Sequence, residues 1–205
     1  MVGSWNINVS VNSMPQKVAT AMGKINDYMV GAEYQPIAYL GSQVVNGTNH
    51  AVLAEQVVVT GRDTKNVVVM IFNEKPNEMD LTLVSIERVV EGGAPLGGVQ
   101  VITETKIPTD AQDAWNAAFE DFVGSKVEPF ALVGTQVVKG TDYIFAATVT
   151  PVAPDAVSKV VIVTVNGLTK TVTFADMLEN KYQASLGYAF TWLKHGIACP
   201  LGEWP

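Results

Sequence analysis

The sequence has little of what several classes of protein require. Its 205 residues include a single cysteine, Cys199, so no disulfide can form within the chain. A chain without disulfides is typical of reducing compartments, and a cytoplasmic location is therefore expected. The first six residues lack the basic start and apolar core of a secretory signal peptide, so a secreted location would require that such a peptide has been removed.

Positive charge and long apolar runs are also scarce. The chain has 13 basic and 20 acidic residues and a net charge of -7. Nucleic-acid binding is disfavoured, because it depends on a concentration of basic side chains. The longest apolar runs, such as residues 67–72, have the length of a strand. They fall short of the roughly 18 to 20 residues that a membrane-spanning helix needs, so no membrane partner is expected.

Groups suited to catalysis are few. The two histidines, His50 and His195, are far apart in sequence and show no metal-ligand spacing. Cys199 and His195 could act as a nucleophile and its base, but Gly196 and Pro200 indicate that both belong to a terminal tail. His50 follows a predicted turn and is expected to face solvent. We therefore predict no enzyme activity, no metal and no cofactor.

The most informative feature that is present is an internal repeat. The segment Gln43-Val44-Val45-Asn46-Gly47-Thr48 returns 93 positions later as Gln136-Val137-Val138-Lys139-Gly140-Thr141. Residues 36–50 and 129–143 share eight identities in fifteen positions without a gap. The register extends backwards, because Pro15, Ala21, Val30 and Gly31 fall on Pro108, Ala114, Val123 and Gly124. Self-similarity of this length predicts two domains of similar fold.

The repeat and the composition together predict the domain organisation. An apolar content of 48% is normal for a globular protein with substantial cores. We expect one domain over 1–90 and a second over 99–175. Residues 91–98 contain four glycines and one proline and are interpreted as a linker. Over 176–205 we expect a helix and tail without a counterpart in the first half, because Leu178, Tyr182, Leu186, Phe190 and Leu193 follow helical spacing.

Each half is predicted to contain one helix. Ser13 and Thr109 each stand three residues before a glutamine, as in a capping box at a helix start. Gly31 and Gly124 suit a left-handed helix stop. The apolar stripes to be buried are Val18, Met22, Ile25 and Met29 in the first helix and Ala111, Trp115, Ala118 and Phe122 in the second.

Four β-rich runs follow each helix and a short strand precedes it. The predicted strands are 5–11, 37–45, 51–60, 66–73 and 81–89, then 99–104, 130–138, 142–150, 158–165 and 169–174. The expected fold class is α+β, with one helix packed on a four- to five-stranded antiparallel sheet in each half.

The repeated motif is predicted to lie at the tip of a hairpin. Asn46-Gly47 is well suited to a type I′ turn, in which both central residues have positive φ, whereas Lys139-Gly140 is less suited. Residues 46–48 also match an N-glycosylation sequon, but a turn is the interpretation we prefer.

Gln-Val-Val-x-Gly resembles the first inhibitory loop of the cystatin superfamily. In the first half the similarity to stefins covers most of residues 14–89, including the run 72–83, and in the second it is strongest over 96–150. Two copies behind two similar helices make the resemblance specific. It implies two tandem cystatin-like domains, and a reversible, non-covalent inhibitor of papain-like cysteine proteases. It also implies that strands can be exchanged to give a strand-swapped dimer.

The resemblance also implies which residues meet a protease. Cystatins insert a wedge made of an N-terminal trunk around a glycine, the first hairpin and a second hairpin. The trunks match Val2-Gly3 and Leu96-Gly97-Gly98, and the first hairpins are Gln43 to Gly47 and Gln136 to Gly140. The second hairpins match Lys75-Pro76 and Gly167-Leu168, although neither half has the Pro-Trp pair of secreted cystatins. The alternative function is a cystatin-like binding or structural module without inhibition, in which the valines pack against the other domain.

Overall fold

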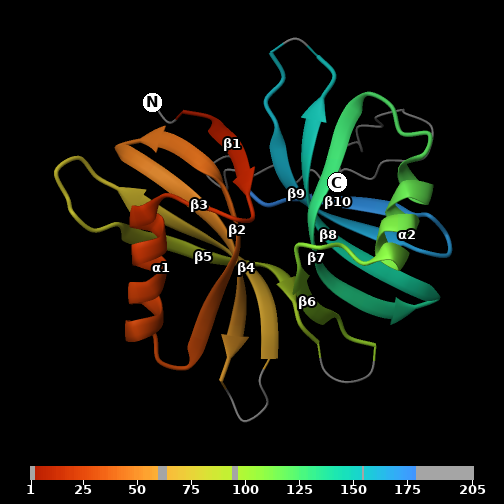
Figure 1. The fold of residues 1–205 in the computed structure, drawn as a ribbon, viewed down its shortest axis with the longest axis horizontal. Coiled ribbons are helices and arrows are strands. Elements are labelled where there is room, and N and C mark those ends of the chain that lie inside the picture. The colour runs from red at the N-terminus through yellow and green to blue at the C-terminus, as the bar shows by residue number, and fades with distance from the viewer. Residues whose placement is uncertain (1–2, 60–63, 94–96, 154, 179–205) are drawn as a thin grey trace, which may run out of the picture.

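The computed structural model describes residues 3–59, 64–93, 97–153 and 155–178. The helix and tail predicted over 176–205 lie outside these residues from position 179 onward. The first half contains β1 (Trp5–Ser10), α1 (Gln16–Tyr28), β2 (Ala32–Val45), β3 (Gly47–Val58), β4 (Thr64–Glu74) and β5 (Thr82–Glu91) (Figure 1). The second half contains β6 (Gln100–Glu104), α2 (Thr109–Phe119), β7 (Ser125–Val138), β8 (Gly140–Pro151), β9 (Lys159–Asn166) and β10 (Val172–Asp176). The predicted α+β class, with one helix and one antiparallel sheet per half, is confirmed.

The two sheets repeat one another in strand order and in register. Their orders are β1-β2-β3-β4-β5 and β10-β9-β8-β7-β6, all antiparallel. The β2–β3 ladder has irregularities between Pro36 and Ala38 and again between Tyr39 and Gly41. The β7–β8 ladder has the same irregularities 93 positions later, between Pro129 and Ala131 and between Leu132 and Gly134. The sequence repeat is therefore a repeat of backbone geometry, including its bulges.

The predicted capping boxes are wrong. The N-cap residues of α1 and α2 are Pro15 and Pro108, with φ of -54° and -60°, and neither helix has a side-chain cap bond. Thr109 is itself the first helical residue, and the Ser13 hydroxyl contacts that of Ser10 at 2.9 Å instead. The proline ring fixes φ near these values, so the repeated proline sets where each helix begins.

The helices are also shorter than their predicted stripes. Val18 and Met22 are buried in α1, as are Ala111 and Trp115 in α2, but Met29 and Phe122 lie past the helix ends. Gly31 and Gly124 do have positive φ, of 93° and 92°. They lie too far beyond the helices to end them, and each accepts a backbone hydrogen bond at the start of the strand that follows, from Val59 and Val152 respectively.

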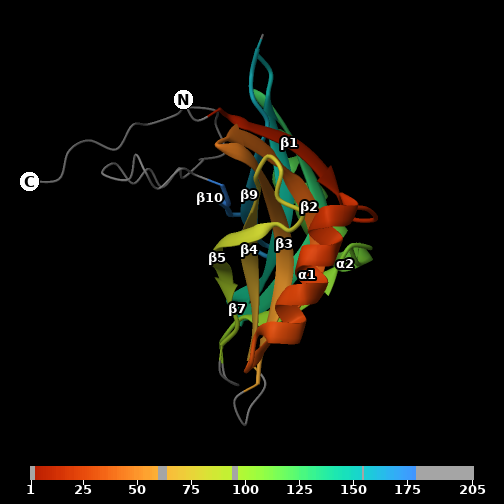
Figure 2. The same cartoon turned by 90° about the vertical axis from the view of Figure 1, so that its left-hand side faces the viewer.

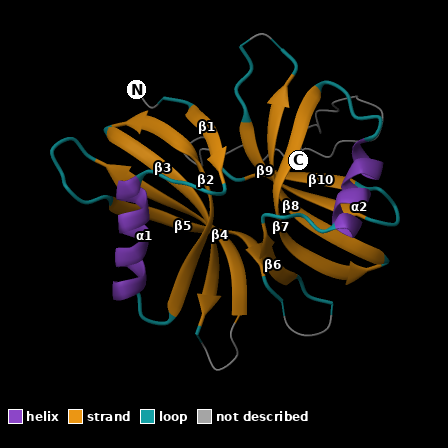
Figure 3. Cartoon of the chain, in the orientation of Figure 1, coloured by secondary structure: helices purple, strands orange, loops and turns teal. Residues whose placement is uncertain are grey.

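The two sheets pack back to back, and the helices cover the outer faces (Figure 3). Residues alternate along each strand between the two faces, as the period of a strand requires. Leu53 and Val69 join the core between the sheets, whereas Val52 and Val68 pack under α1. Figure 2 shows the molecule from the side of α1. The layers are α1, first sheet, second sheet and α2.

The second half contributes to the same central core. Val133, Ile144, Ala146, Val160 and Ile162 meet the back of the first sheet there. Polar contacts also cross between the halves, because the Thr103 hydroxyl of β6 donates to Glu55 of β3 at 3.1 Å. The two halves are therefore joined by a continuous apolar interface as well as by the chain.

The connection between the halves is closely packed where the structure describes it. The Gly93 amide donates to the Val99 carbonyl at 3.0 Å, and the Gly92 amide donates to the Asn66 side chain at 3.1 Å. A Cβ added to Gly92 would overlap the Lys65 carbonyl oxygen. At Gly92 and Gly93, in the segment that we interpreted as a linker, glycine therefore allows close passage of one backbone beside another.

Candidate functional site

In the first half, the repeated motif holds the N-terminal segment in place. The Gln43 side chain is only 4% exposed, and its Nε2 donates to the Gly3 carbonyl at 2.9 Å. The Gly3 amide in turn donates to the Val44 carbonyl at 2.9 Å. The structure thus brings the predicted trunk glycine beside the predicted hairpin. Val2, the other trunk residue, lies outside the described residues.

The second half repeats this contact. Gln136 Nε2 donates to the Gly97 carbonyl at 2.7 Å, which is the same bond to the matching trunk glycine. Gly98 follows it before β6, and Leu96 lies outside the described residues. A bond between a motif glutamine and a trunk glycine in both halves shows that the repeat extends to side-chain chemistry.

The hairpin valines face solvent at both tips. Val44 is 70% exposed and Val137 is 76% exposed, and Val138 is 43% exposed. Val45 is half-buried. Neither tip is therefore packed against the other half, because the faces that join the halves lie farther back along the strands.

The turns themselves differ from the prediction. Gly47 and Gly140 have φ of 100° and 94°, but Asn46 and Lys139 are not among the described residues with positive φ. A type I′ turn is therefore excluded at both tips. The pairings Val45 with Gly47 and Val138 with Gly140 are equivalent, so the two tips have the same pairing although Asn46-Gly47 and Lys139-Gly140 differ in their suitability for a type I′ turn.

The second predicted loop lies beside the first tip. In the first half, an open hollow of about 760 Å³ is bounded by the β2–β3 turn and by the β4–β5 loop. Its lining residues are Lys17, Val44, Val45, Gly47, Thr48, Glu74, Lys75, Pro76, Asn77, Glu78 and Met79. A Cβ at Gly47 would overlap the Glu74 carbonyl oxygen, so glycine is required there both by its φ and by this close approach.

In the second half, the β9–β10 turn is bonded directly to the hairpin tip. The Gly167 amide donates to the Thr141 carbonyl at 2.8 Å, and Asn166 Nδ2 donates to the Lys139 carbonyl at 3.3 Å. Leu168 lies against the tip, since its Cβ would be 2.8 Å from a Cβ placed on Gly140. Trunk, first hairpin and second hairpin thus meet in each half.

The two assemblies lie on opposite sides of the molecule. In Figure 1 the yellow β4–β5 loop stands at the left edge and the blue β9–β10 turn at the right edge. We call the group formed by Gly3, residues 43–47 and residues 75–76 the first end. We call the group formed by residues 97–98, 136–140 and 167–168 the second end.

A polar network around a buried histidine lies behind the first end and was missed by sequence reasoning. His50, expected to face solvent, is 8% exposed. Its Nδ1 lies 2.9 Å from the Tyr39 hydroxyl and its Nε2 lies 3.2 Å from Glu74 Oε2. Glu74 also pairs with Lys17 of α1. The hydrogen bonds from Lys17 and His50 lower the pKa of Glu74, and burial raises the pKa of Tyr39.

The second half has different residues at the corresponding positions. In the 93-residue register, His50 corresponds to Tyr143 and Lys17 to Asp110. The Tyr143 hydroxyl donates to Asp110 at 3.0 Å, and burial together with this carboxylate raises the pKa of Tyr143. No local pattern marks His50 as buried, which explains why the sequence did not reveal the network.

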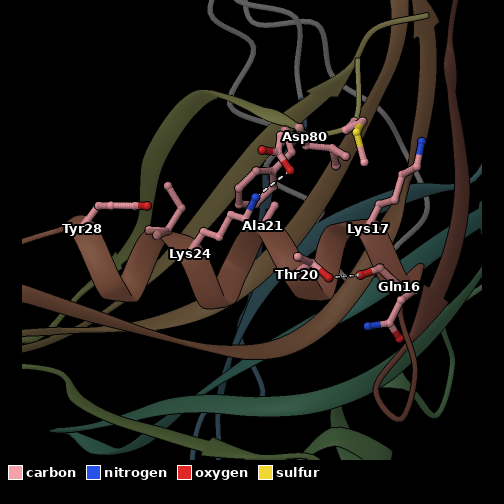
Figure 4. A pocket seen from close by; sticks show the side chains of 11 residues that line it. Gln16, Lys17, Thr20, Ala21, Lys24, Tyr28 and Asp80 are labelled. Carbon is pink, nitrogen blue, oxygen red and sulfur yellow. Dashed lines mark hydrogen bonds and ion pairs between the residues drawn. The ribbon is translucent and has the colours of Figure 1, made fainter. Parts of the chain in front are cut away.

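A groove runs along α1 between the helix and the β4–β5 loop (Figure 4). Its volume is about 330 Å³, and Lys24 reaches across it to Asp80 at 2.6 Å. The groove has charged residues, Lys17, Lys24 and Asp80, at its rim and apolar residues that include Ala21 and Phe72 in its floor. It contains no pair of groups arranged as nucleophile and base.

No protein-family model matches the chain, and no curated protein matches it significantly.

Within the described residues no cluster of three or more histidine, cysteine, aspartate or glutamate side chains could hold a metal ion. Neither described helix is long and apolar enough to cross a membrane. His195 and Cys199 lie outside the described residues.

Proposed function

We propose that this protein is a cystatin-like, reversible and non-covalent inhibitor of papain-like cysteine proteases. The observation that supports this best is the recurrence, at both ends, of exposed valines on a hairpin whose glutamine holds the trunk glycine. In the cystatin family the same three elements block the active-site cleft of the protease. The resemblance noted in the sequence thus concerns residues that the fold brings together in space.

The geometry of each end suits a surface that fills a cleft. Burying one exposed valine in a partner contributes roughly 1.5 to 3 kcal/mol. Apolar anchors near the centre of an interface tend to contribute most of its binding energy. The strands behind each tip belong to a sheet buried on both faces, so the tip is held before binding and loses little conformational entropy on association.

The placement of the ends on opposite sides supports two enzymes per chain. Each end has its own exposed valine, at position 44 or 137, and neither valine is covered by the other half. A cytoplasmic location remains part of the proposal, as does the absence of catalysis and of cofactors.

A titration of papain with the full-length chain tests the proposal. We expect inhibition that saturates at two enzymes per chain. The double variant Val44→Asp with Val137→Asp should abolish inhibition, because a carboxylate at each tip would have to be desolvated in the cleft. The matched control is Val59→Asp with Val152→Asp. These valines are 57% and 79% exposed and lie at the far ends of β3 and β8, away from the tips.

The variants proposed here preserve the turns. Gln43 and Gly47 are buried or sterically required, so changing them would disturb the fold and the site together. We expect a dissociation constant well below about 1 μM. If the unmodified chain does not inhibit papain at about micromolar concentration, the proposal is rejected. The alternative function is a binding module without inhibition. The observation that favours it is the Lys75–Glu78 ion pair in the β4–β5 loop of the first end, because charged residues there suit an apolar cleft poorly.

A further inference from the structure

We infer, on the premise of the proposed function, that the second end is the principal inhibitory surface and fits a cleft with apolar walls. Three large apolar side chains are exposed there: Val137 at 76%, Leu168 at 62% and Val138 at 43%. They belong to two adjacent turns, since Leu168 lies against the turn glycine, Gly140. The second end therefore offers one apolar surface from both of its hairpins.

The two turns of this surface are joined by one side chain. Asn166 Oδ1 accepts hydrogen bonds from the backbone amides of Leu168 at 3.0 Å and Thr169 at 2.8 Å. Its Nδ2 donates to the Lys139 carbonyl at 3.3 Å and to Asp142 at 2.7 Å. These bonds fix Leu168 relative to the valines before any partner arrives, which lowers the entropic cost of binding.

The first end differs in charge. Its second loop has Lys75 at the position that corresponds to Leu168, and Lys75 pairs with Glu78 at 3.3 Å, so the one large apolar side chain exposed in this loop, Met79, lies beside charges. The Lys17–Glu74 pair lies in the same hollow. Placing paired charges in a water-excluding cleft costs desolvation that their mutual attraction does not fully offset.

The first end also offers less apolar surface on its hairpin. Val45 is half-buried, whereas its counterpart Val138 is exposed. Both ends share the bond between glutamine and trunk glycine, so the trunk does not account for a difference in affinity. The difference between the ends therefore comes from their second loops and from the second valine.

Single-end variants test this inference with papain as the probe. Val137→Asp leaves only the first end intact, and Val44→Asp leaves only the second. We expect Val137→Asp to raise the inhibition constant by about 100-fold or more, and Val44→Asp to raise it by less than about 5-fold. Leu168→Asp should act like Val137→Asp, and Val152→Asp should leave the constant unchanged. All four positions are well exposed, and circular dichroism would verify that each variant is folded.

Salt dependence tests the apolar character of the cleft contact. In the Val44→Asp variant only the second end can bind papain. Its inhibition constant should change by less than about threefold between about 0.05 and 0.5 M NaCl, because salt does not screen apolar contacts. Equal effects of the two single variants, a larger effect of Val44→Asp, or strong weakening by salt would overturn the inference. Absence of inhibition by the unmodified chain would instead reject the proposed function itself.

Discussion

Replacing Gln43 by alanine should both destabilise the fold and release the N-terminal segment. Gln43 is buried, donates to the Gly3 carbonyl at 2.9 Å and accepts from Asn49 Nδ2 at 3.3 Å. Asn49 in turn accepts from Asn73 on β4 at 2.8 Å. The side chain therefore links the trunk to three neighbouring strands at the first end.

The magnitude follows from the bonds that are lost. Each hydrogen bond contributes about 0.5 to 1.5 kcal/mol, and a buried partner left unpaired adds to the cost. We expect Gln43→Ala to lower the free energy of unfolding by about 2 kcal/mol, or roughly 4 to 8 °C in melting temperature for a chain of this size. Gln136→Ala removes one bond at a half-buried position, so its cost should be about 1 kcal/mol or less.

Urea unfolding measures the stabilities, and hydrogen exchange at the Gly3 amide measures the release of the trunk. That amide donates to the Val44 carbonyl, and it should exchange faster once the bond from Gln43 to the Gly3 carbonyl is lost. Gln35→Ala, an exposed glutamine on the same strand, is the control. Our reasoning would be refuted if Gln136→Ala cost as much as Gln43→Ala, or if exchange at Gly3 did not change.

Two further predictions concern the same end. Glu74 has a lowered pKa, so its bonds to Lys17 and His50 stabilise the fold above the ordinary carboxyl value of 4.5, and this stabilisation is lost as the pH falls through the lowered pKa. Glu74→Gln should lower the free energy of unfolding by about 1 kcal/mol at neutral pH and make it depend less on pH between about pH 3 and 7, as measured by urea unfolding. An unchanged pH dependence in the variant would contradict this prediction. Gly47→Ala should destabilise by more than the roughly 1 kcal/mol expected for Gly31→Ala, which has similar φ but open space around it. Equal melting temperatures of the two variants would show that the contact with the Glu74 backbone is unimportant.

The strands could be predicted because the sequence repeats them. The shared Pro, Gly and Val positions of residues 36–50 and 129–143 fixed one register for both halves, and the structure reproduces it down to the paired bulges. The hydrogen bonds from the motif glutamines to the trunk glycines were not predicted, because they join positions about 40 residues apart in the sequence.

The packing of the two sheets was not predicted, although a signal was present. Residues 67–72 form an unbroken apolar run, and Val160 to Val163 form another. Strands with one face in water alternate between apolar and polar residues, whereas strands buried on both faces do not. Reading these runs in this way would have indicated a covered back face on each sheet.

Other errors arose from competition between local signals. The repeated prolines override the capping-box sequences that surround them, because the ring fixes the backbone before any side chain can cap it. His50 is buried by partners 11 and 24 positions away in sequence, Tyr39 and Glu74. A contact between distant positions leaves no trace in a local window.

The apolar layer between the sheets makes the two copies thermodynamically dependent on each other. If the second half unravelled, Leu53 and Val69 of the first would face water, and if the first half unravelled, Ala146 of the second would. Melting should therefore proceed in one cooperative step, and damage to either copy weakens both. A substitution on the inner face of one sheet should therefore require a compensating change on the inner face of the other.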